Sequence, residues 1–366
     1  MRTWRKAAIL GDGQMGLLCA WILADAELEG VGAGPRPQTV ALWGYDEQDI
    51  ASVAQQRTSP RLAGAHVPDS VCVTASIDEA VEGADIVVCA TPTQFIRNVF
   101  TRARGARGGL GADAAIVTVS KGIEIDTGLL PTQIILDTLG ELAPAESVDA
   151  LPTSRRNAGE RLIAALSGPT IATELARGLP ATMVAVSEES AFCEDVQRLF
   201  STRFLRIYTH HDVVGVELAG AAKNVVAIAA GVLDGLDAGC NAKSALLARG
   251  MAEIARLGEA LGADHDTFFG VAGVGDLATS CFSPHGRNRS CGEALGRGQS
   301  LEHHLASTAS VVEGVATTRS IMALSKQAGV EMPIASAVHA VLYEHVPPIA
   351  AIEQLMTRPL KEEHVG

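Results

Sequence analysis

The sequence predicts an α/β protein with a doubly wound, mostly parallel sheet, followed by an all-α C-terminal domain. Three observations support this fold class. Short apolar segments alternate with helical segments through the first half of the chain, a glycine-rich turn follows the first apolar segment, and long helical patterns replace the short apolar runs after about residue 210. Strands that alternate with helices form a parallel sheet with helices on both faces.

The composition is that of a folded, acidic chain of 366 residues, with room for two or three hydrophobic cores at roughly 150 residues per domain. With 47% hydrophobic and 19% charged residues, the chain has too much apolar surface for a disordered protein. Its formal charge of −13 argues against binding of nucleic acid or anionic lipid through overall charge. We therefore expect no nucleic-acid partner, and local cations would have to bind an anionic substrate.

Cysteine usage and apolar run lengths indicate the compartment. The seven cysteines are scattered without C-x-x-C spacing, which fits a reducing cytosol, so we expect a cytoplasmic protein. The longest apolar runs, such as 225–233, are about half of the roughly 20 residues that span a bilayer, and we expect no membrane insertion. Residues Gly11–Gln14 separate the apolar segment 6–10 from the apolar stretch 15–24. A signal peptide needs a continuous apolar segment, so this break favours a strand, turn and helix.

The first half is expected to begin with a short buried strand at 6–10, a glycine turn at 11–16 and a helix from 15 to about 24. A polar loop at 27–38 leads to a second strand at 39–43. Further strands are expected at 71–74, 85–90, 115–119, 161–166, 182–187 and 204–208, with helices between several of them, for example at 78–82 and 131–139.

The domain boundary is expected near residue 210, which gives a dinucleotide-binding domain at 1–210 and a helical domain at 211–366. Residues 140–160 show no periodicity and are interpreted as a surface insertion in the first domain. In the second domain, helices are expected at 213–236, 242–261, 293–296, 315–328 and 336–343.

The turn Gly11-Asp-Gly13-Gln-Met-Gly16 has the spacing of a dinucleotide-binding turn between a strand and a helix. The first glycine allows the tight turn, the second lets the backbone approach a pyrophosphate, and the third lets the helix pack on the strand. This predicts a Rossmann-like domain, although such a turn can also merely connect a strand to a helix. Asp12 places a negative charge in a turn meant for phosphates, so its side chain must either point away from them or weaken binding.

The coenzyme is expected to be NAD or NADP, with a preference for NAD. The second predicted strand is followed by Gly44-Tyr45-Asp46, where this fold binds the adenosine ribose, so Tyr45 is a candidate coenzyme contact. No arginine stands in that segment to bind the 2′-phosphate of NADP. Arg36, Arg57 or Arg61 could still fold into reach.

Beyond the glycine turn, several motifs occur in an order that resembles the NAD(P)-dependent glycerol-3-phosphate dehydrogenases, from about residue 7 to about residue 345. The main interruptions of the resemblance are the loop at 27–38 and the insertion at 140–160. The motifs are the Leu42-Trp43 strand end, Val119–Glu124, Ser167–Ala172, Glu217–Asn224, Gly273–Cys281 with Gly286–Arg289, Val311–Gly314 and Met332–Ile334.

The resemblance implies reversible hydride transfer from NAD(P)H to dihydroxyacetone phosphate, which gives sn-glycerol 3-phosphate for phospholipid synthesis. It also implies a homodimer that pairs through the helical domain. No metal is implied, and the adjacent His210 and His211 do not form a metal-ligand pattern because their side chains point differently.

The resemblance assigns catalysis to Lys223, Lys121 and Asp276. Reduction of a carbonyl leaves a developing alkoxide, which needs a proton donor and nearby positive charge. Lys223 matches the acid/base lysine, Lys121 would orient the carbonyl from the end of a predicted strand, and Asp276 would bind the Lys223 ammonium or a substrate hydroxyl.

The substrate phosphate would be bound by Arg287 and Asn288, since a guanidinium and an amide supply several donors. Gly286 stands where the family usually has a serine, so one hydroxyl donor is missing, and Cys240 stands where relatives often have Asp. Gly168 and Thr170 match the family's substrate turn, which completes the expected substrate-binding set of Lys121, Gly168, Thr170, Lys223, Asp276, Gly286, Arg287 and Asn288.

Coenzyme contacts are expected from both halves of the chain. Gln14 and Met15 replace the more usual serine and aromatic residue beside the pyrophosphate. The expected set is Gly11, Gly13, Gln14, Met15, Gly16, Tyr45, Lys121, Ala172, Arg287, Val311 and Glu313.

Two other functions remain open on the sequence alone. A related two-domain dehydrogenase of the β-hydroxyacid type would act on a carboxylate substrate and would not depend on Arg287. A non-catalytic dinucleotide sensor would bind the coenzyme without turnover, and the departures at Gly286 and Cys240 would then reflect lost activity.

Overall fold

The computed structural model describes all residues except 1, 31, 146–149, 309, 361 and 364–366. Its contacts divide the chain into two compact units. Unit 1 comprises residues 1–120, 131–144 and 156–213, and unit 2 comprises 121–130, 145–155 and 214–366. The sequence-based division into 1–210 and 211–366 therefore differs at two short segments, which pack with the helical unit although they lie within the first half of the chain.

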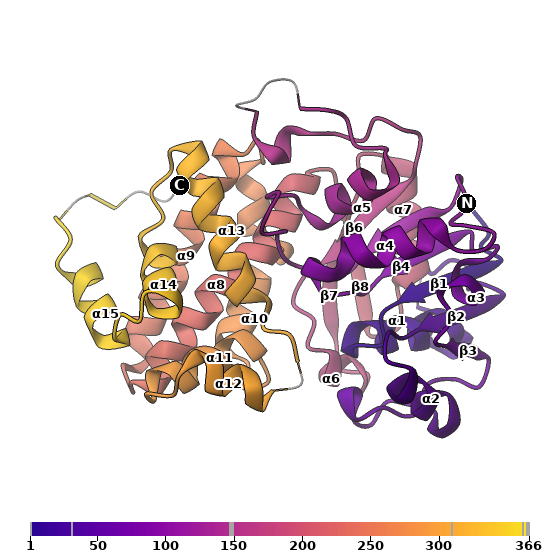
Figure 1. The fold of residues 1–366 in the computed structure, drawn as a ribbon, viewed down its shortest axis with the longest axis horizontal. Helices are drawn as coiled ribbons and strands as arrows, with labels where there is room; N and C mark the ends of the chain where they lie inside the picture. The colour runs from indigo at the N-terminus through magenta and orange to yellow at the C-terminus, as the bar shows by residue number, and fades with distance from the viewer. Residues whose placement is uncertain (1, 31, 146–149, 309, 361, 364–366) are drawn as a thin grey trace. The chain divides into compact units, whose positions relative to one another are not determined.

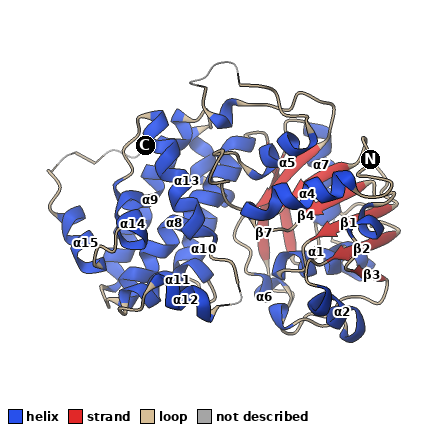
Figure 2. Ribbon diagram, in the orientation of Figure 1, coloured by secondary structure: helices blue, strands red, loops and turns tan. Residues whose placement is uncertain are grey.

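Unit 1 is built on one eight-stranded sheet with strand order β3-β2-β1-β4-β5-β6-β7-β8 (Figures 1 and 2). All neighbours pair in parallel except β6 and β7, which are antiparallel. The doubly wound, mostly parallel sheet is thus confirmed. The strands are β1 (Lys6–Leu10), β2 (Thr39–Trp43), β3 (Val71–Thr74), β4 (Ile86–Cys89), β5 (Ala115–Thr118), β6 (Ile163–Ser167), β7 (Ala181–Val186) and β8 (Leu205–His210).

The central strand β1 pairs with β2 on one side and with β4 on the other, so the strand order reverses between β1 and β4. Leu10 is in register with both Trp43 and Cys89, which brings the carboxyl ends of these three strands level. In open α/β sheets, ligands bind outside the carboxyl ends of the strands at such a reversal. The turn that follows Leu10 lies at this position.

Helices of unit 1 form two groups. Helix α1 packs with α6 and α7, whereas α4 packs with α3 and α5. Most strand residues are buried because both faces of the sheet are covered, which explains their continuous apolar runs. The helices are α1 (Gln14–Ala24), α2 (Glu47–Gln56), α3 (Ile77–Val81), α4 (Ile96–Gly105), α5 (Pro131–Leu139), α6 (Ala172–Leu175) and α7 (Ser190–Phe200).

Among the described residues of unit 2, helices are the only regular secondary structure, and loops connect them (Figure 2). The all-α prediction for the C-terminal half is confirmed, with more helices than the sequence predicted. The helices are α8 (Val213–Gly235), α9 (Gly239–Ala260), α10 (Asp276–Phe282), α11 (Arg287–Gly296), α12 (Leu301–Ser307), α13 (Glu313–Ala328), α14 (Pro333–Tyr343) and α15 (Pro348–Met356).

Helix α8 is the central helix of unit 2. It is long and apolar enough to cross a membrane, and longer than the runs on which the sequence-based expectation rested. However, 89% of its most apolar window is buried inside the protein, as in the core helix of a globular unit. Ile123 and Leu130, from the segment that precedes α5, belong to the same hydrophobic core.

Helices α8 and α11 approach each other at two pairs of glycines. A Cβ on Gly231 would lie 1.9 Å from the Arg289 carbonyl oxygen, and one on Gly292 would lie 1.9 Å from the Ile228 carbonyl oxygen. Gly235 and Gly296 repeat this arrangement one turn further along the two helices. Glycines at these positions therefore allow the start of α11 to pack directly against α8.

Candidate active site

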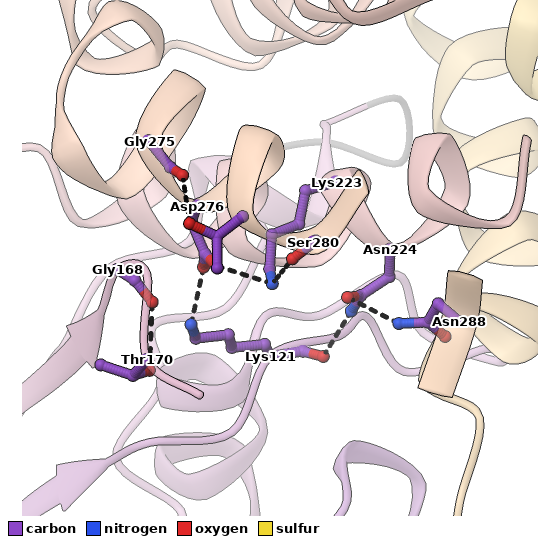
Figure 3. Close-up of polar contacts among 10 residues, drawn as sticks. Lys121, Gly168, Thr170, Lys223, Asn224, Gly275, Asp276, Ser280 and Asn288 are labelled. Carbon is purple, nitrogen blue, oxygen red and sulfur yellow. Dashed lines mark hydrogen bonds and ion pairs between the residues drawn. The ribbon is translucent and has the colours of Figure 1, made fainter. Parts of the chain in front are cut away.

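Lys223 lies in the middle of α8, and its side chain is only 9% exposed. Its Nζ donates to Ser280 Oγ at 2.6 Å and lies 2.8 Å from Asp276 Oδ1 (Figure 3). A buried ammonium needs such partners, because an unpaired charge away from water is strongly destabilising. Lys223 therefore does not extend from the helix surface into solvent.

Lys121 reaches the same carboxylate from the segment after β5. Its Nζ donates to Asp276 Oδ2 at 2.6 Å, so the two oxygens of Asp276 are shared between two ammonium groups. The pKa of Lys121 is lowered to about 8, chiefly by burial; the charge of Asp276 opposes this shift and the charge of Lys223 adds to it. We call Lys121, Lys223, Asp276 and Ser280 the lysine–aspartate cluster. Two cations and one anion leave it with net positive charge.

Asp276 is positioned by a π-helical turn, Val271–Gly275, that leads directly into α10. The Gly275 N–H donates to the Gly270 carbonyl at 3.3 Å, which is the wide spacing of this turn. A Cβ on Gly273 would lie 2.0 Å from the Phe268 carbonyl oxygen, so the turn requires glycine there. The side chain of Asp276 is 3% exposed, which strengthens its interaction with both lysines.

A chain of amide hydrogen bonds continues from the lysine–aspartate cluster to α11 and α13 (Figure 3). Asn224 donates to the Lys121 carbonyl at 3.3 Å, and Asn288 donates to Asn224 Oδ1 at 2.9 Å. Asn288 Oδ1 accepts from the Gly314 N–H at 2.9 Å. Asn288 keeps one further amide hydrogen, because a side-chain amide nitrogen has two.

Helix α11 begins at Arg287, with Gly286 as its N-cap in an extended conformation. Arg287 is exposed, and the carboxylate of Glu313, at the start of α13, interacts with it electrostatically. Val311 is 40% exposed and lies two residues before Glu313. The predicted phosphate-binding residues thus lie at a helix N-terminus, where backbone N–H groups favour anions.

Arg289, two residues further, is oriented by a separate ion-pair network. Its Nε lies 2.6 Å from Asp234 Oδ2 on α8, and its Nη1 lies 3.4 Å from Glu293 Oε2. Lys243 on α9 pairs with the other oxygen of Asp234. The guanidinium of Arg289 therefore ties α11 to α8.

In unit 1, the glycine turn has the backbone geometry that its spacing predicts. Gly11 has a φ of 123°, and a Cβ there would lie 2.6 Å from the Ala90 carbonyl oxygen. A Cβ on Gly16 would lie 1.8 Å from the Gly11 carbonyl oxygen, whereas a Cβ on Gly13 would meet no atom within 4 Å. Gly11 and Gly16 are thus required by the protein itself, and the open space at Gly13 fits the approach of a pyrophosphate.

Gln14 and Met15 lie within the glycine turn, where α1 begins, and both side chains are half-buried. Tyr45 follows β2 and is 72% exposed. Arg102 lies over the Tyr45 ring, 5.6 Å from its centroid. Phe95, which the sequence analysis did not single out, is 53% exposed just after β4. Exposed aromatic rings at the carboxyl ends of β2 and β4 could contact a purine base.

The three arginines left open in the sequence all have protein partners. Arg36 donates to the carbonyls of Leu199 and Ser201, the latter at 3.0 Å. Arg57 donates to the Val71 carbonyl at 2.8 Å. Arg61 pairs with Asp12, so the Asp12 side chain is directed to a protein partner.

The turn after β6 contains Gly168, with a φ of 142° that favours glycine. The hydroxyl of Thr170 donates to the Gly168 carbonyl at 3.1 Å (Figure 3). Ala172 is buried at the start of α6. These three residues belong to unit 1 and share one short turn.

The structure brings Lys121, Lys223 and Asp276 together and links Asn288 to them through Asn224. Sequence reasoning missed Ser280 and Asn224. The spacing could have indicated Ser280, since it lies four residues after Asp276 on one helix face.

Among the described residues, no group of three or more His, Cys, Asp and Glu side chains could hold a metal ion. The expectation that the His210 and His211 side chains point differently is wrong, because their rings stack on each other with centroids 5.0 Å apart. All seven cysteines are free thiols, and Cys240 is exposed at the start of α9.

Comparisons with known proteins match both halves of the chain. Residues 6–148 match the model for the N-terminus of NAD-dependent glycerol-3-phosphate dehydrogenase, and residues 212–353 match the model for its C-terminus.

Two curated relatives are named glycerol-3-phosphate dehydrogenase [NAD(P)+]. The chain is 39% identical over 359 residues to the protein from Chlorobium phaeobacteroides (strain BS1), which covers 98% of this chain and 99% of that protein. It is 42% identical over 326 residues to a protein from Salinibacter ruber, with coverage of 89% and 90%.

Among solved structures, the glycerol-3-phosphate dehydrogenase of Coxiella burnetii superposes with a TM-score of 0.84 at 29% identity, over 97% of this chain and 99% of that chain.

Proposed function

This chain belongs to the family of NAD-dependent glycerol-3-phosphate dehydrogenases, and from that premise we propose that it reduces dihydroxyacetone phosphate to sn-glycerol 3-phosphate, or catalyses the reverse reaction. The observation that carries the proposal is the lysine–aspartate cluster, in which one buried carboxylate binds two ammonium groups. Such a site can donate a proton and stabilise negative charge on the same oxygen.

The glycine turn fits a dinucleotide. Gly11 and Gly16 allow the tight turn, and the open space at Gly13 lets the backbone N–H groups face a pyrophosphate. When bound, the reduced nicotinamide supplies hydride to C2 of the ketone. The residues proposed to contact the coenzyme, besides the glycines, are Gln14, Met15, Tyr45, Lys121, Ala172, Arg287, Val311 and Glu313.

Lys223 is proposed to donate the proton to the developing C2 alkoxide and to recover it in the reverse reaction. Asp276 and Ser280 hold its ammonium at 2.8 and 2.6 Å, which limits its motion in the buried site. Lys121 is proposed to orient the carbonyl oxygen and to stabilise the alkoxide by its charge. Because burial lowers the pKa of Lys121 to about 8, its charge is lost under mildly basic conditions.

The substrate phosphate is proposed to bind at the start of α11. Arg287 supplies a forked donor, Asn288 supplies its remaining amide hydrogen, and Gly286 supplies a backbone N–H in place of the missing serine hydroxyl. The glycines between α8 and α11 fix this helix start relative to Lys223. Gly168 and Thr170 are proposed to contact the substrate from unit 1.

NAD is the proposed coenzyme rather than NADP, because Gly44-Tyr45-Asp46 offers no cation where a 2′-phosphate would bind.

We further propose that the product supplies the glycerol backbone of phospholipids, and that the protein acts in the cytoplasm as a homodimer. All seven cysteines being free thiols supports a reducing compartment. Light scattering would show the mass of a dimer or a monomer.

The activity is tested by following oxidation of NADH with dihydroxyacetone phosphate and with dihydroxyacetone, which lacks the phosphate. Arg287→Ala should raise the KM for the phosphorylated substrate by about tenfold or more and leave the weak reaction with dihydroxyacetone unchanged. Arg319→Ala, on α13, is a control at an arginine outside the site.

A folded, NADH-binding protein without turnover would support a non-catalytic sensor. Turnover of a hydroxy acid instead would support the β-hydroxyacid alternative.

A further inference from the structure

Asp12, within the glycine turn, is held by an arginine from another segment of unit 1. Arg61 lies in a short 3-10 turn, Pro60–Leu62, and donates through Nη1 to Asp12 Oδ2. Its Nη2 donates to Asp49 Oδ2 at 2.5 Å. We call Asp12, Arg61 and Asp49 the arginine clamp. The side chain of Asp12 is 13% exposed and that of Asp49 is 56% exposed, so the bond to Asp12 is the better shielded of the two.

The arginine clamp joins two segments that enclose the adenosine ribose in this fold. In dinucleotide-binding sheets, the ribose 2′-oxygen lies between the glycine turn and the residues that follow the second strand. Here β2 ends at Trp43, Asp46 caps α2 by accepting from the N–H groups of Gln48 and Asp49, and Asp49 itself lies in the first turn of α2. Arg61 therefore connects the glycine turn to the start of α2.

The charges in this region disfavour a phosphate on the 2′-oxygen. Two carboxylates, from Asp12 and Asp49, pair with the two terminal nitrogens of a single guanidinium, and the nearby carboxylate of Asp46 caps the start of α2. A neutral 2′-hydroxyl can donate to a carboxylate, whereas a dianionic 2′-phosphate would be repelled by it. NADP recognition requires a cation that is free to bind this phosphate.

We propose that Asp12 and Asp49 hold Arg61 as an internal counter-ion, keep it from binding a 2′-phosphate, and thereby make the enzyme select NAD(H) over NADP(H). The inference rests on the proposed function, since it concerns the coenzyme of that reaction. Burial raises the pKa of Asp12, and the charge of Arg61 opposes this shift, so the ion pair offsets part of the cost of a buried carboxylate in this turn.

Two rival arrangements make different predictions. Arg61 could leave its partners and bind the 2′-phosphate itself, because its side chain is 39% exposed. Arg102 could bind it instead, since its guanidinium lies over the rings of Trp43 and Tyr45, 5.3 and 5.6 Å from their centroids. Either arrangement gives an enzyme that binds NADPH well.

The test is a fluorescence titration of the full-length protein with NADH and with NADPH, in the absence of substrate. The wild type should bind NADH more tightly. D12N/D49N should free Arg61 and improve the NADPH-to-NADH affinity ratio by about tenfold, the effect of one charge-assisted hydrogen bond. Adding R61Q to this double variant should remove the gain. D49N alone alters only an exposed side chain and gives a smaller shift in the same direction if D12N does not fold.

The control is R57Q, because Arg57 belongs to the same region but donates to the Val71 carbonyl, and its affinity ratio should equal that of the wild type. Wild-type protein that binds NADPH as tightly as NADH, or a D12N/D49N variant with an unchanged ratio, would overturn the inference. So would an R102Q variant that loses only NADPH binding. Turnover of dihydroxyacetone phosphate is measured separately, so intact discrimination without turnover would reject the proposed function and not the arginine clamp.

Discussion

The glycine turn of unit 1 and the lysine–aspartate cluster of unit 2 are built in opposite ways. The turn is a run of consecutive residues whose function depends on backbone N–H groups and on missing side chains, as the space around Gly13 shows. The cluster consists of side chains alone, and Lys121 and Asp276 are 155 positions apart in the sequence. Changes in the turn should therefore affect coenzyme binding or stability, whereas changes in the cluster should affect the chemical step.

The largest effect is expected from Lys223→Met, which removes the ammonium but keeps an unbranched apolar side chain in the buried position. We expect kcat for dihydroxyacetone phosphate to fall about a thousandfold, as for the loss of a general acid. NADH affinity should stay at the wild-type value, because the glycine turn is unchanged. Steady-state kinetics and NADH titration measure the two quantities. Lys326→Met, at an exposed lysine of α13, is the control, and a Lys223 variant with more than a tenth of wild-type kcat would contradict this role.

Asp276→Asn should lower kcat about a hundredfold, because it leaves two buried ammonium groups without their shared anion. It should also move the pH profile. The reduction needs Lys121 protonated, so kcat/KM should fall as the pH rises through about 8 in the wild type. The charge of Asp276 raises the pKa of Lys121, so its removal should shift this fall to lower pH. Asp266→Asn, at a fully exposed carboxylate, is the control and should keep the wild-type pH profile. An unshifted pH profile in Asp276→Asn would show that Lys121 does not set the pH dependence of kcat/KM.

Within the glycine turn, Gly13→Ala and Gly16→Ala should have different consequences. The added methyl at Gly13 meets no protein atom within 4 Å, so stability should stay within about 0.5 kcal/mol while NADH affinity falls about tenfold. The methyl at Gly16 would lie 1.8 Å from the Gly11 carbonyl oxygen and should lower the free energy of unfolding by about 1–3 kcal/mol. Denaturant unfolding and NADH titration distinguish the two. An unchanged NADH affinity in Gly13→Ala would show that the coenzyme does not approach the backbone at Gly13.

The sequence predicted the fold of unit 1 well because its strands are buried on both faces, and such strands appear as continuous apolar runs. It did not predict that β7 runs antiparallel to β6, since strand direction leaves no mark on an apolar run. It also placed residues 121–130 with the sheet. Ile123 and Leu130 instead pack into the helical core, and only tertiary contacts decide between two cores of similar polarity.

At the site, the glycine turn could be found from six consecutive residues, because each glycine meets a local conformational or packing requirement. Lys223 and Asp276 were found as members of motifs, but their shared contact with Lys121 could not be read from spacing. Asn224 was overlooked for the same reason, because its role depends on a carbonyl of residue 121 and an amide of residue 288. The partners of Arg61 likewise became apparent only from the structure.

The smallest effect is expected from Ser280→Ala, which sharpens the description of the lysine–aspartate cluster. The substitution removes one hydrogen-bond partner of Lys223, at 2.6 Å, and leaves the ion pair with Asp276 intact. One net hydrogen bond of about 1 kcal/mol corresponds to a roughly fivefold fall in kcat, with KM little changed. Ser280→Thr keeps the hydroxyl and should restore most of the rate, and Ser244→Ala, at an exposed serine of α9, should have no effect. If Ser280→Ala matched the loss in Lys223→Met, the hydroxyl itself would be part of the proton path; if it had no effect, Asp276 alone would suffice to orient the lysine.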